Sequence, residues 1–231
     1  MPLLGGLALI AIAFVIGSIA IGHGIRDCNQ NDVIVVTGSA KKRITSDYVI
    51  LTLSVTSTQA SATNAATELG GWTGKIRSFL ASQGVEPAEL SVQPISTEAI
   101  SKGGQVRAYR LTRRFEIRSA RVQGITDVAD HSATLLGQGI PLSADSPQYV
   151  YTKLSSLRPQ LLAEATKDAQ NRAKVIVKAT GSSLGRLRGV DVGVFQVTSP
   201  NSTEVEDYGV YDTGTLEKDV TAVVNVTFAL K

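Results

Sequence analysis

Side chains that could do nucleophilic or acid–base chemistry are few in this chain. Ser39-Ala-Lys-Lys42 matches the S-x-x-K pattern of serine acyl enzymes, in which the lysine lies one helical turn from the nucleophile and further motifs accompany it. Here the pattern falls at the end of an expected strand, and no K-T-G occurs anywhere in the sequence. We interpret it as a chance match.

The sequence contains no clear pattern of metal-binding or cofactor-binding residues. The sequence holds two His and one Cys, which leaves little for a zinc or copper site, and His131 has no His or Cys near it. Gly137-Gln-Gly139 and Gly181-Ser-Ser-Leu-Gly185 lack dinucleotide or P-loop spacing and are expected to be turns and a helix cap. The sequence therefore predicts a protein that is not an enzyme, with no catalytic, cofactor-binding or metal-binding residues.

The marked electrostatic feature is a run of arginines: Arg107, Arg110, Arg113, Arg114, Arg118 and Arg121. Such a run could meet anionic lipid, nucleic acid or an acidic protein surface. Nucleic-acid readers interleave stacking aromatics with their charges, but Tyr109 and Phe115 lie on the expected core face and the net charge is only +3, so we expect no nucleic acid. Two interpretations stay open. The run is either a solvated face neutralised by nearby carboxylates, or it pairs with an acidic loop that holds Glu204, Glu206, Asp207 and Asp212.

Hydrophobic periodicity predicts the elements that position these residues. Tyr48–Ser57 alternates apolar and polar residues, as a half-buried strand does. In the arginine strand, Tyr109, Leu111, Arg113, Phe115 and Ile117 share one face. Other expected strands are Asp32–Thr37, Leu90–Ile100 interrupted at Pro94, Gln148–Lys153, Leu187–Val197 and Lys218–Leu230, with a hairpin loop at Ser101–Gly104 and a solvated turn at Lys41–Arg43. With helices over residues 61–82, 122–137 and about 159–180, the pattern predicts an α+β fold with antiparallel sheets and packed helices.

The helix over residues 61–82 has two distinct faces. One carries an apolar stripe: Ala62, Ala65, Leu69, Trp72, Ile76 and Leu80. The other carries a small-residue row: Thr63, Thr67, Gly71, Gly74 and Ser78. Interior glycines cost a helix about 1 kcal/mol each relative to alanine, so the row indicates either close approach of another backbone or a frayed helix. We hypothesise that the row contacts another subunit, with Arg110, Arg114 and Arg118 and the acidic loop as complementary charges.

The stretch Leu161–Leu187 is expected to be the central packing helix and its cap. Its predicted core stripe is Leu162, Ala165, Ala169, Ala173, Ile176 and Thr180. Pro159 suits a first helical turn and Gly181 a left-handed C-terminal cap. Asp168 and Arg172 form a favourable pair one turn apart on the polar side.

This stretch also carries a family resemblance. Ala165-x-x-Asp168-Ala169-x-x-Arg172-Ala173-x-x-Ile176, followed by Gly181-x-x-Leu184-Gly185-x-Leu187, resembles the signature of the SIMPL-domain family, the YggE-like envelope proteins. Further pieces agree in order: Val33–Ala40, Tyr109–Ile117 and Val220–Phe228. The resemblance covers residues 32–231, with Ser46 where the family usually has proline. It implies the fold and a role in the cell envelope and in stress tolerance, and it supplies no catalytic residues.

The N-terminus is uniformly apolar. Residues 2–22 contain no charge, and a helix of that length reaches roughly 30 Å, enough to cross a bilayer core. A cleaved secretory signal is the alternative, but a basic n-region and an A-x-A-like cleavage site are missing. We expect a membrane anchor helix at residues 1–24, a short linker at 25–31 and the domain at 32–231. Cys28 is either a free juxtamembrane thiol or part of an intermolecular disulfide.

These expectations combine into one functional prediction. The chain is predicted to be a non-enzymatic envelope protein, anchored in the inner membrane as a single-pass protein, that self-assembles into a homo-oligomer. The residues Lys41–Arg43 favour a cytoplasmic domain by the positive-inside rule, whereas the resemblance favours the periplasmic side, which we adopt. The alternatives are a ligand- or peptide-binding module of the envelope and an unrecognised hydrolase, for which no nucleophile–base pair can be named.

Overall fold

The computed structural model describes residues 32–203 and 208–231. The chain forms two compact units. The described part of unit 1 contains residues 32–41, 158–195 and 221–231, and that of unit 2 contains residues 42–157, 196–203 and 208–220. Among the described residues, no helix is apolar and long enough to be a membrane span. The predicted anchor and linker, with Cys28, lie outside the described residues.

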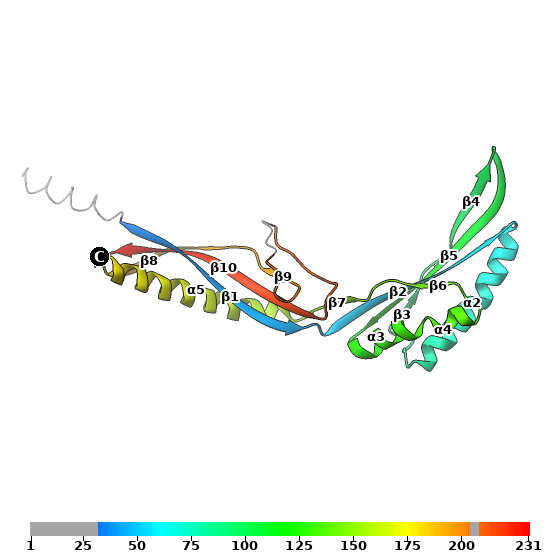
Figure 1. Ribbon diagram of the computed structural model, residues 1–231, viewed down its shortest axis with the longest axis horizontal. Coiled ribbons are helices and arrows are strands. Elements are labelled where there is room, and N and C mark those ends of the chain that lie inside the picture. Colours follow the sequence, from blue (N-terminus) through cyan, green and yellow to red (C-terminus); the bar gives the residue numbers. More distant parts are fainter. Residues whose placement is uncertain (1–31, 204–207) are drawn as a thin grey trace, which may run out of the picture. The chain divides into compact units, whose positions relative to one another are not determined.

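Figure 1 shows the helices and strands in chain order. They are β1 (Val33–Thr45), β2 (Tyr48–Gln59), α2 (Ala62–Ser82), β3 (Leu90–Val92), β4 (Ser96–Lys102), β5 (Gln105–Ser119), α3 (Val122–His131), α4 (Thr134–Gly137), β6 (Leu142–Ala144), β7 (Gln148–Val150), α5 (Leu154–Ala179), β8 (Leu184–Val192), β9 (Gln196–Thr198) and β10 (Glu217–Leu230). The α+β class with antiparallel sheets and packed helices is confirmed.

Unit 2 is built on a six-stranded sheet with the order β3-β5-β2-β6, in which β4 also pairs with β5 and β7 with β2. The central pair β2–β5 is antiparallel, with Val49 opposite Ser119 and Gln59 opposite Tyr109. One face of this pair packs against the helices, and these of its apolar residues are buried: Val49, Leu51, Leu53, Val55, Leu111, Phe115 and Ile117. The predicted alternation in both strands is therefore confirmed.

The helix α2 covers this face through residues spaced three or four apart: Ala65, Leu69, Thr73, Ile76 and Leu80. The helix predicted over residues 122–137 is instead two helices, α3 and α4. Ser132 Oγ donates to Ala129 O, and Thr134 Oγ1 donates to His131 O. Hydroxyls that bond the preceding turn compete with helix continuation, which the apolar pattern does not reveal.

The hairpin β4–β5 turns through Gly103 and Gly104, both with positive φ (63° and 76°), and Lys102 pairs with Gln105. Positive φ at both central residues is the mark of a type I′ turn, whose twist matches the flanking strands. The predicted hairpin loop and the interruption of the preceding strand at Pro94 are confirmed.

The solvated turn predicted at Lys41–Arg43 is wrong, because β1 continues through these residues to Thr45. Arg43 donates two hydrogen bonds from one edge of its guanidinium group to the buried Asp219 of β10, at 2.9 Å from Nε to Oδ1 and 3.2 Å from Nη2 to Oδ2. A buried carboxylate must be paired and hydrogen-bonded, and Asn201 N also donates to Asp219 Oδ2 at 3.0 Å. The charged residues Lys41–Arg43 suggest the end of a strand. The distant partner Asp219 instead allows β1 to continue through them.

Unit 1 places α5 against a sheet with the order β1-β10-β8. The buried residues of α5 repeat every fourth position: Leu157, Leu161, Ala165, Ala169, Ala173 and Val177. The predicted stripe was therefore right at its three alanines and wrong at its ends, since Ile176 is 44% exposed and Val177 only 5%. Pro159 lies inside the helix, which begins at Leu154, and not in its first turn.

A contact between β1 and α5 fixes this rotation. A Cβ atom added to Gly38 would lie 2.2 Å from Ala165 O and 2.5 Å from Ala169 N. The next residue, Ser39, donates its backbone N–H to Asp168 Oδ2 at 2.9 Å, and Asp168 also pairs with Arg172 at 2.8 Å. The hydrogen bond from Ser39 is the main reason that the pKa of Asp168 lies below its usual value. The predicted Asp168–Arg172 pair is confirmed, and its further bond to β1 was not foreseen.

The C-terminus of α5 is closed as predicted. Gly181 has a φ of 73°, Ser182 N donates to Val177 O at 3.0 Å, and Gly181 N donates to Lys178 O at 3.4 Å. These two bonds form a Schellman motif. The motif ends the helix and starts the return of the chain to β8.

Gly38→Ala is expected to destabilise unit 1 by about 1–3 kcal/mol, because the added methyl group overpacks against the α5 backbone. The control is Gly189→Ala in β8, where nothing lies within 4 Å of the added atom. Urea unfolding followed by circular dichroism measures both variants. Equal stability of the two variants would contradict the close packing of β1 on α5.

Candidate interaction surfaces

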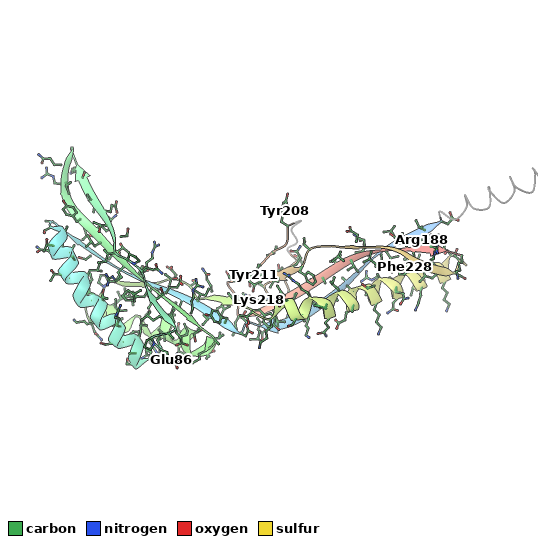
Figure 2. All side chains as sticks on the ribbon, turned by 180° about the vertical axis from the view of Figure 1, so that it is seen from behind. Glu86, Arg188, Tyr208, Tyr211, Lys218 and Phe228 are labelled. Carbon is green, nitrogen blue, oxygen red and sulfur yellow. The ribbon has the colours of Figure 1, made fainter. Side chains whose placement is uncertain are left out.

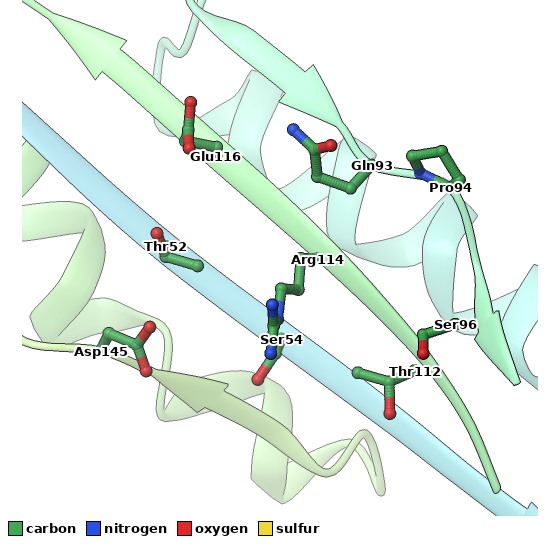
Figure 3. Close-up of a pocket in the computed structure, with 9 residues that line it drawn as sticks. All are labelled: Thr52, Ser54, Gln93, Pro94, Ser96, Thr112, Arg114, Glu116 and Asp145. Carbon is green, nitrogen blue, oxygen red and sulfur yellow. The ribbon is translucent and has the colours of Figure 1, made fainter. Parts of the chain in front are cut away.

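A polar groove lies on the face of the unit 2 sheet that the helices leave open. Its cavity volume is about 830 Å³, and the residues that line it are Thr52, Ser54, Gln93, Pro94, Ser96, Thr112, Arg114, Glu116 and Asp145. They come from β2, β5, the β3–β4 connection and the segment after β6, as Figure 3 shows. Because side chains alternate along a strand, the apolar pattern that buries one face of β2 and β5 also makes this face polar.

The groove brings opposite charges and hydroxyls together. Ser54 lies directly opposite Arg114 in the β2–β5 ladder, and Thr52 opposite Glu116; Figure 3 shows the side chains of Ser54 and Arg114 close together. Glu116 accepts a hydrogen bond from Arg118 Nε at 2.5 Å, so its charge is compensated. A guanidinium flanked by hydroxyls can bind a carboxylate, and Asp145 can accept from an ammonium or hydroxyl group.

Three of the six arginines of the run form ion pairs within unit 2. Arg110 pairs with Glu98 at 2.9 Å, Arg118 with Glu116 at 2.5 Å and Arg121 with Glu89 at 2.5 Å. These contacts support a solvated face neutralised by nearby carboxylates. Glu204, Glu206 and Asp207 lie outside the described residues, so their pairing with arginines stays a prediction.

Asp212, the remaining acidic residue of the loop, is bound elsewhere. It pairs with Lys218 Nζ at 3.3 Å and accepts from Gly214 N at 2.9 Å. Burial lowers the pKa of Lys218 against the opposing effect of Asp212, and the ammonium group also donates to Thr215 O. The interpretation of Asp212 as an arginine partner is therefore wrong. A fully buried lysine needs a carboxylate, and its place in β10 was not recognisable as buried from sequence.

The small-residue row of α2 is open to solvent. All of its members are exposed: Thr63, Thr67, Gly71, Gly74 and Ser78. Nothing in the described part of the chain lies within 4 Å of a Cβ atom added to Gly71 or Gly74. The close backbone approach that these glycines suggest is therefore not supplied by the described residues of the same chain.

An apolar surface on β8 was not singled out from sequence. Val190 and Val192 pair with Val226 and Val224, which are buried on the α5 side of the sheet. Nevertheless Leu187, Val190 and Val192 are 53%, 45% and 51% exposed. Beside them a cavity of about 520 Å³ is lined by Leu162, Ala163, Thr166, Lys167, Gln170, Leu187 and Phe228. We call Leu187, Val190 and Val192 the β8 apolar surface; Figure 2 labels the neighbouring Phe228.

No three His, Cys, Asp or Glu side chains gather in a metal-binding arrangement among residues 32–203 and 208–231. The described residues do form a polar groove, an exposed row of small residues and an exposed apolar surface on an edge strand.

The fold is that of an α+β protein. Three residues of the sequence signature, Ala165, Asp168 and Ala169, contact the first strand, β1, at Gly38 and Ser39. The sequence model of the SIMPL family, described as a protein of unknown function (DUF541), matches residues 34–228. The chain therefore belongs to the SIMPL family, which confirms the resemblance. A comparison with curated proteins finds no match for the sequence.

The pair Glu89–Arg121 gives a pH-dependent prediction. The hydrogen bond from Arg121 lowers the pKa of Glu89 to about 2, against the effect of burial and with the help of Ser119 Oγ and Glu86 N. A carboxylate with a lowered pKa contributes stability that is full above its unfolded pKa of 4.5 and is lost as the pH falls toward about 2. Glu89→Gln should therefore cost about 1–3 kcal/mol at neutral pH and progressively less below pH 4.5.

Urea unfolding across this pH range measures the effect. The control is Glu98→Gln, whose carboxylate pairs with Arg110 in the same way but has a side chain that is 61% exposed, and which should cost at most about 0.5 kcal/mol. A penalty for Glu89→Gln that did not shrink in acid would exclude ionisation of Glu89 as its source.

Proposed function

We propose that this protein is a non-enzymatic, membrane-anchored envelope protein that self-assembles into a homo-oligomer and supports envelope integrity or stress tolerance. The observation that carries self-assembly is the β8 apolar surface. It combines half-exposed apolar side chains with a strand at the end of its sheet. Contiguous apolar residues on a sheet edge favour association.

A second copy of the chain is the occupant that we propose. An edge strand can pair with the same strand of another copy about a two-fold axis, which satisfies its backbone groups and covers the same residues on both sides. The small-residue row of α2 is a proposed second contact, since close packing of another backbone would offset the cost of its glycines. Arg110, Arg114 and Arg118 would then face Glu204, Glu206 and Asp207 of a neighbouring subunit and set its register.

The membrane part of the proposal rests on the sequence. Residues 2–22 carry no charge over a length that can span a bilayer. Placement of residues 32–231 on the periplasmic side of the inner membrane follows the family resemblance, as do the roles in the envelope and in stress tolerance.

Leu187→Glu should shift the detergent-extracted full-length protein to smaller species, because it places a charge within the apolar contact. Mass measurement of the purified protein, by light scattering coupled to gel filtration, detects the change. Gly71→Leu, measured in the same way, reports on the α2 row. It should raise the stability of the monomer by up to about 1 kcal/mol because a helical glycine is removed.

The matched control is Val175→Glu, which adds the same charge at another exposed apolar residue of unit 1. It should leave the assembly unchanged. A monomeric wild-type protein, or equal masses for wild type and Leu187→Glu, would remove the proposal that β8 joins two copies.

The polar groove favours a second candidate function, a ligand- or peptide-binding module. Arg114 would take the carboxylate and Asp145 the ammonium group of a zwitterionic ligand. With the dipeptide Ala-Ala as probe, Arg114→Gln should weaken binding at least about tenfold, the cost of losing a charged hydrogen bond. Amide chemical shifts of Ser54 and Thr112 in the full chain report binding.

Arg107→Gln, an exposed arginine of β5 that is not among the residues lining the groove, serves as the control for Arg114→Gln. Shifts that were absent in the wild-type protein, or unchanged by Arg114→Gln, would dismiss this candidate.

A further inference from the structure

The small net charge of the chain conceals an uneven distribution. The described part of unit 1 contains nine Lys and Arg but only four Asp and Glu, which gives it a net charge of +5. The whole chain carries +3, so the remainder is slightly acidic. The arginine run is the densest group of cations in the sequence, but it belongs to unit 2, where three of its six arginines pair with carboxylates.

Several cations of unit 1 lie at one end of it. Arg186, Arg188 and Lys231 line a cavity of about 480 Å³ with Gly185, Ala229 and Leu230. Lys178 lies in the last turn of α5, and the Schellman motif leads from there to Ser183, which exchanges two backbone hydrogen bonds with Lys231. All four cations are exposed. We call Lys178, Arg186, Arg188 and Lys231 the cationic surface.

The N-terminal segment joins unit 1 at this same end. Asp32, the first described residue, accepts a hydrogen bond from Leu230 N at 2.8 Å, and Leu230 pairs with Leu184 of β8. Figure 1 shows the start of β1 beside the C-terminal end of the chain, and Figure 2 labels Arg188 there. Between Gly22, the last residue of the uncharged stretch, and Asp32, an extended chain spans at most about 36 Å. A bilayer that holds residues 2–22 is therefore within reach of the cationic surface.

We propose that the cationic surface contacts the anionic phospholipid headgroups of the membrane that holds the N-terminal segment. The inference rests on the membrane anchoring proposed above. Arginine binds phosphate with a planar fork of donors, and each basic residue near an anionic leaflet adds attraction. That attraction becomes weak beyond a Debye length of about 8 Å at physiological salt. The contact therefore requires unit 1 to lie close to the leaflet, with the cationic surface facing the lipid.

Lipid suits this surface better than nucleic acid. The residues that line the cavity with these cations include no aromatic side chain on which bases could stack. A bilayer is also the anionic surface that the chain itself brings near, whereas a soluble polyanion would have to be supplied. The other residues that line the cavity, Gly185, Ala229 and Leu230, have no carboxylate side chain that would repel a phosphate group.

Hydrogen–deuterium exchange of the full chain in vesicles tests the contact. One set of vesicles is pure phosphatidylcholine, and the other contains phosphatidylcholine and phosphatidylglycerol in equal amounts. Amides of residues 183–188 should exchange at least about threefold more slowly in the anionic vesicles, and the difference should vanish at about 0.5 M salt, where the Debye length is roughly 4 Å. The double variant Arg186→Ser/Lys231→Ser should abolish the difference. The charge-matched control Lys102→Ser/Arg107→Ser, in unit 2, should retain it.

The outcomes separate the contact from the anchoring. Retention on phosphatidylcholine vesicles after a high-salt wash tests the anchor alone. Retention with equal exchange in both vesicle types overturns the headgroup contact and leaves the anchor standing. Binding only to anionic vesicles, released by salt and lost in Arg186→Ser/Lys231→Ser, supports the contact while refuting the anchor. Slow amide exchange of residues 183–188 that is equal in both vesicle types and insensitive to salt would assign the cationic surface to a contact with a second copy of the chain. It would overturn the proposal.

Discussion

The close approach of β1 to α5 at Gly38 is the constraint on which unit 1 depends. Only a residue without a side chain fits against Ala165 O and Ala169 N, and only small residues on the helix allow the approach. Asp168 secures the contact because it accepts the backbone N–H of Ser39. The family signature is thus a description of one packing contact. Its alanines set the distance, and its aspartate fixes where β1 lies along the helix.

This contact also explains the surface that unit 1 leaves open. The helix is held against β1 through its alanines, and several apolar residues of β1 and β10 are buried in unit 1: Val36, Ala222, Val224, Val226 and Phe228. The strand β8 turns Leu187, Val190 and Val192 to the same side, yet these residues remain half exposed. A helix placed close to one edge of a sheet leaves the other edge uncovered. We infer that assembly supplies the missing cover.

The two units manage charge in different ways. In unit 2, arginines and carboxylates share a sheet face and pair there, and the buried Asp219 is held by Arg43. Such pairing neutralises charge on the sheet face, and the open groove contains both a donor, Arg114, and acceptors, Glu116 and Asp145. Unit 1 instead has an excess of cations at the end where the N-terminal segment joins. An exposed surface with an excess of cations suits an anionic partner of large area, such as a bilayer.

The sequence by itself determined what local periodicity can encode. It predicted the alternating strands β2 and β5, the core face of α2, the turn at Gly103-Gly104, the cap at Gly181 and, through its spaced alanines, the family. The tertiary structure alone decided what depends on distant partners: the extension of β1 by Asp219, the ends of the α5 stripe, the pairing of Asp212 with Lys218 and the exposure of β8. These features escape a sequence because burial and ion pairing are set by neighbours that meet only when the chain has folded.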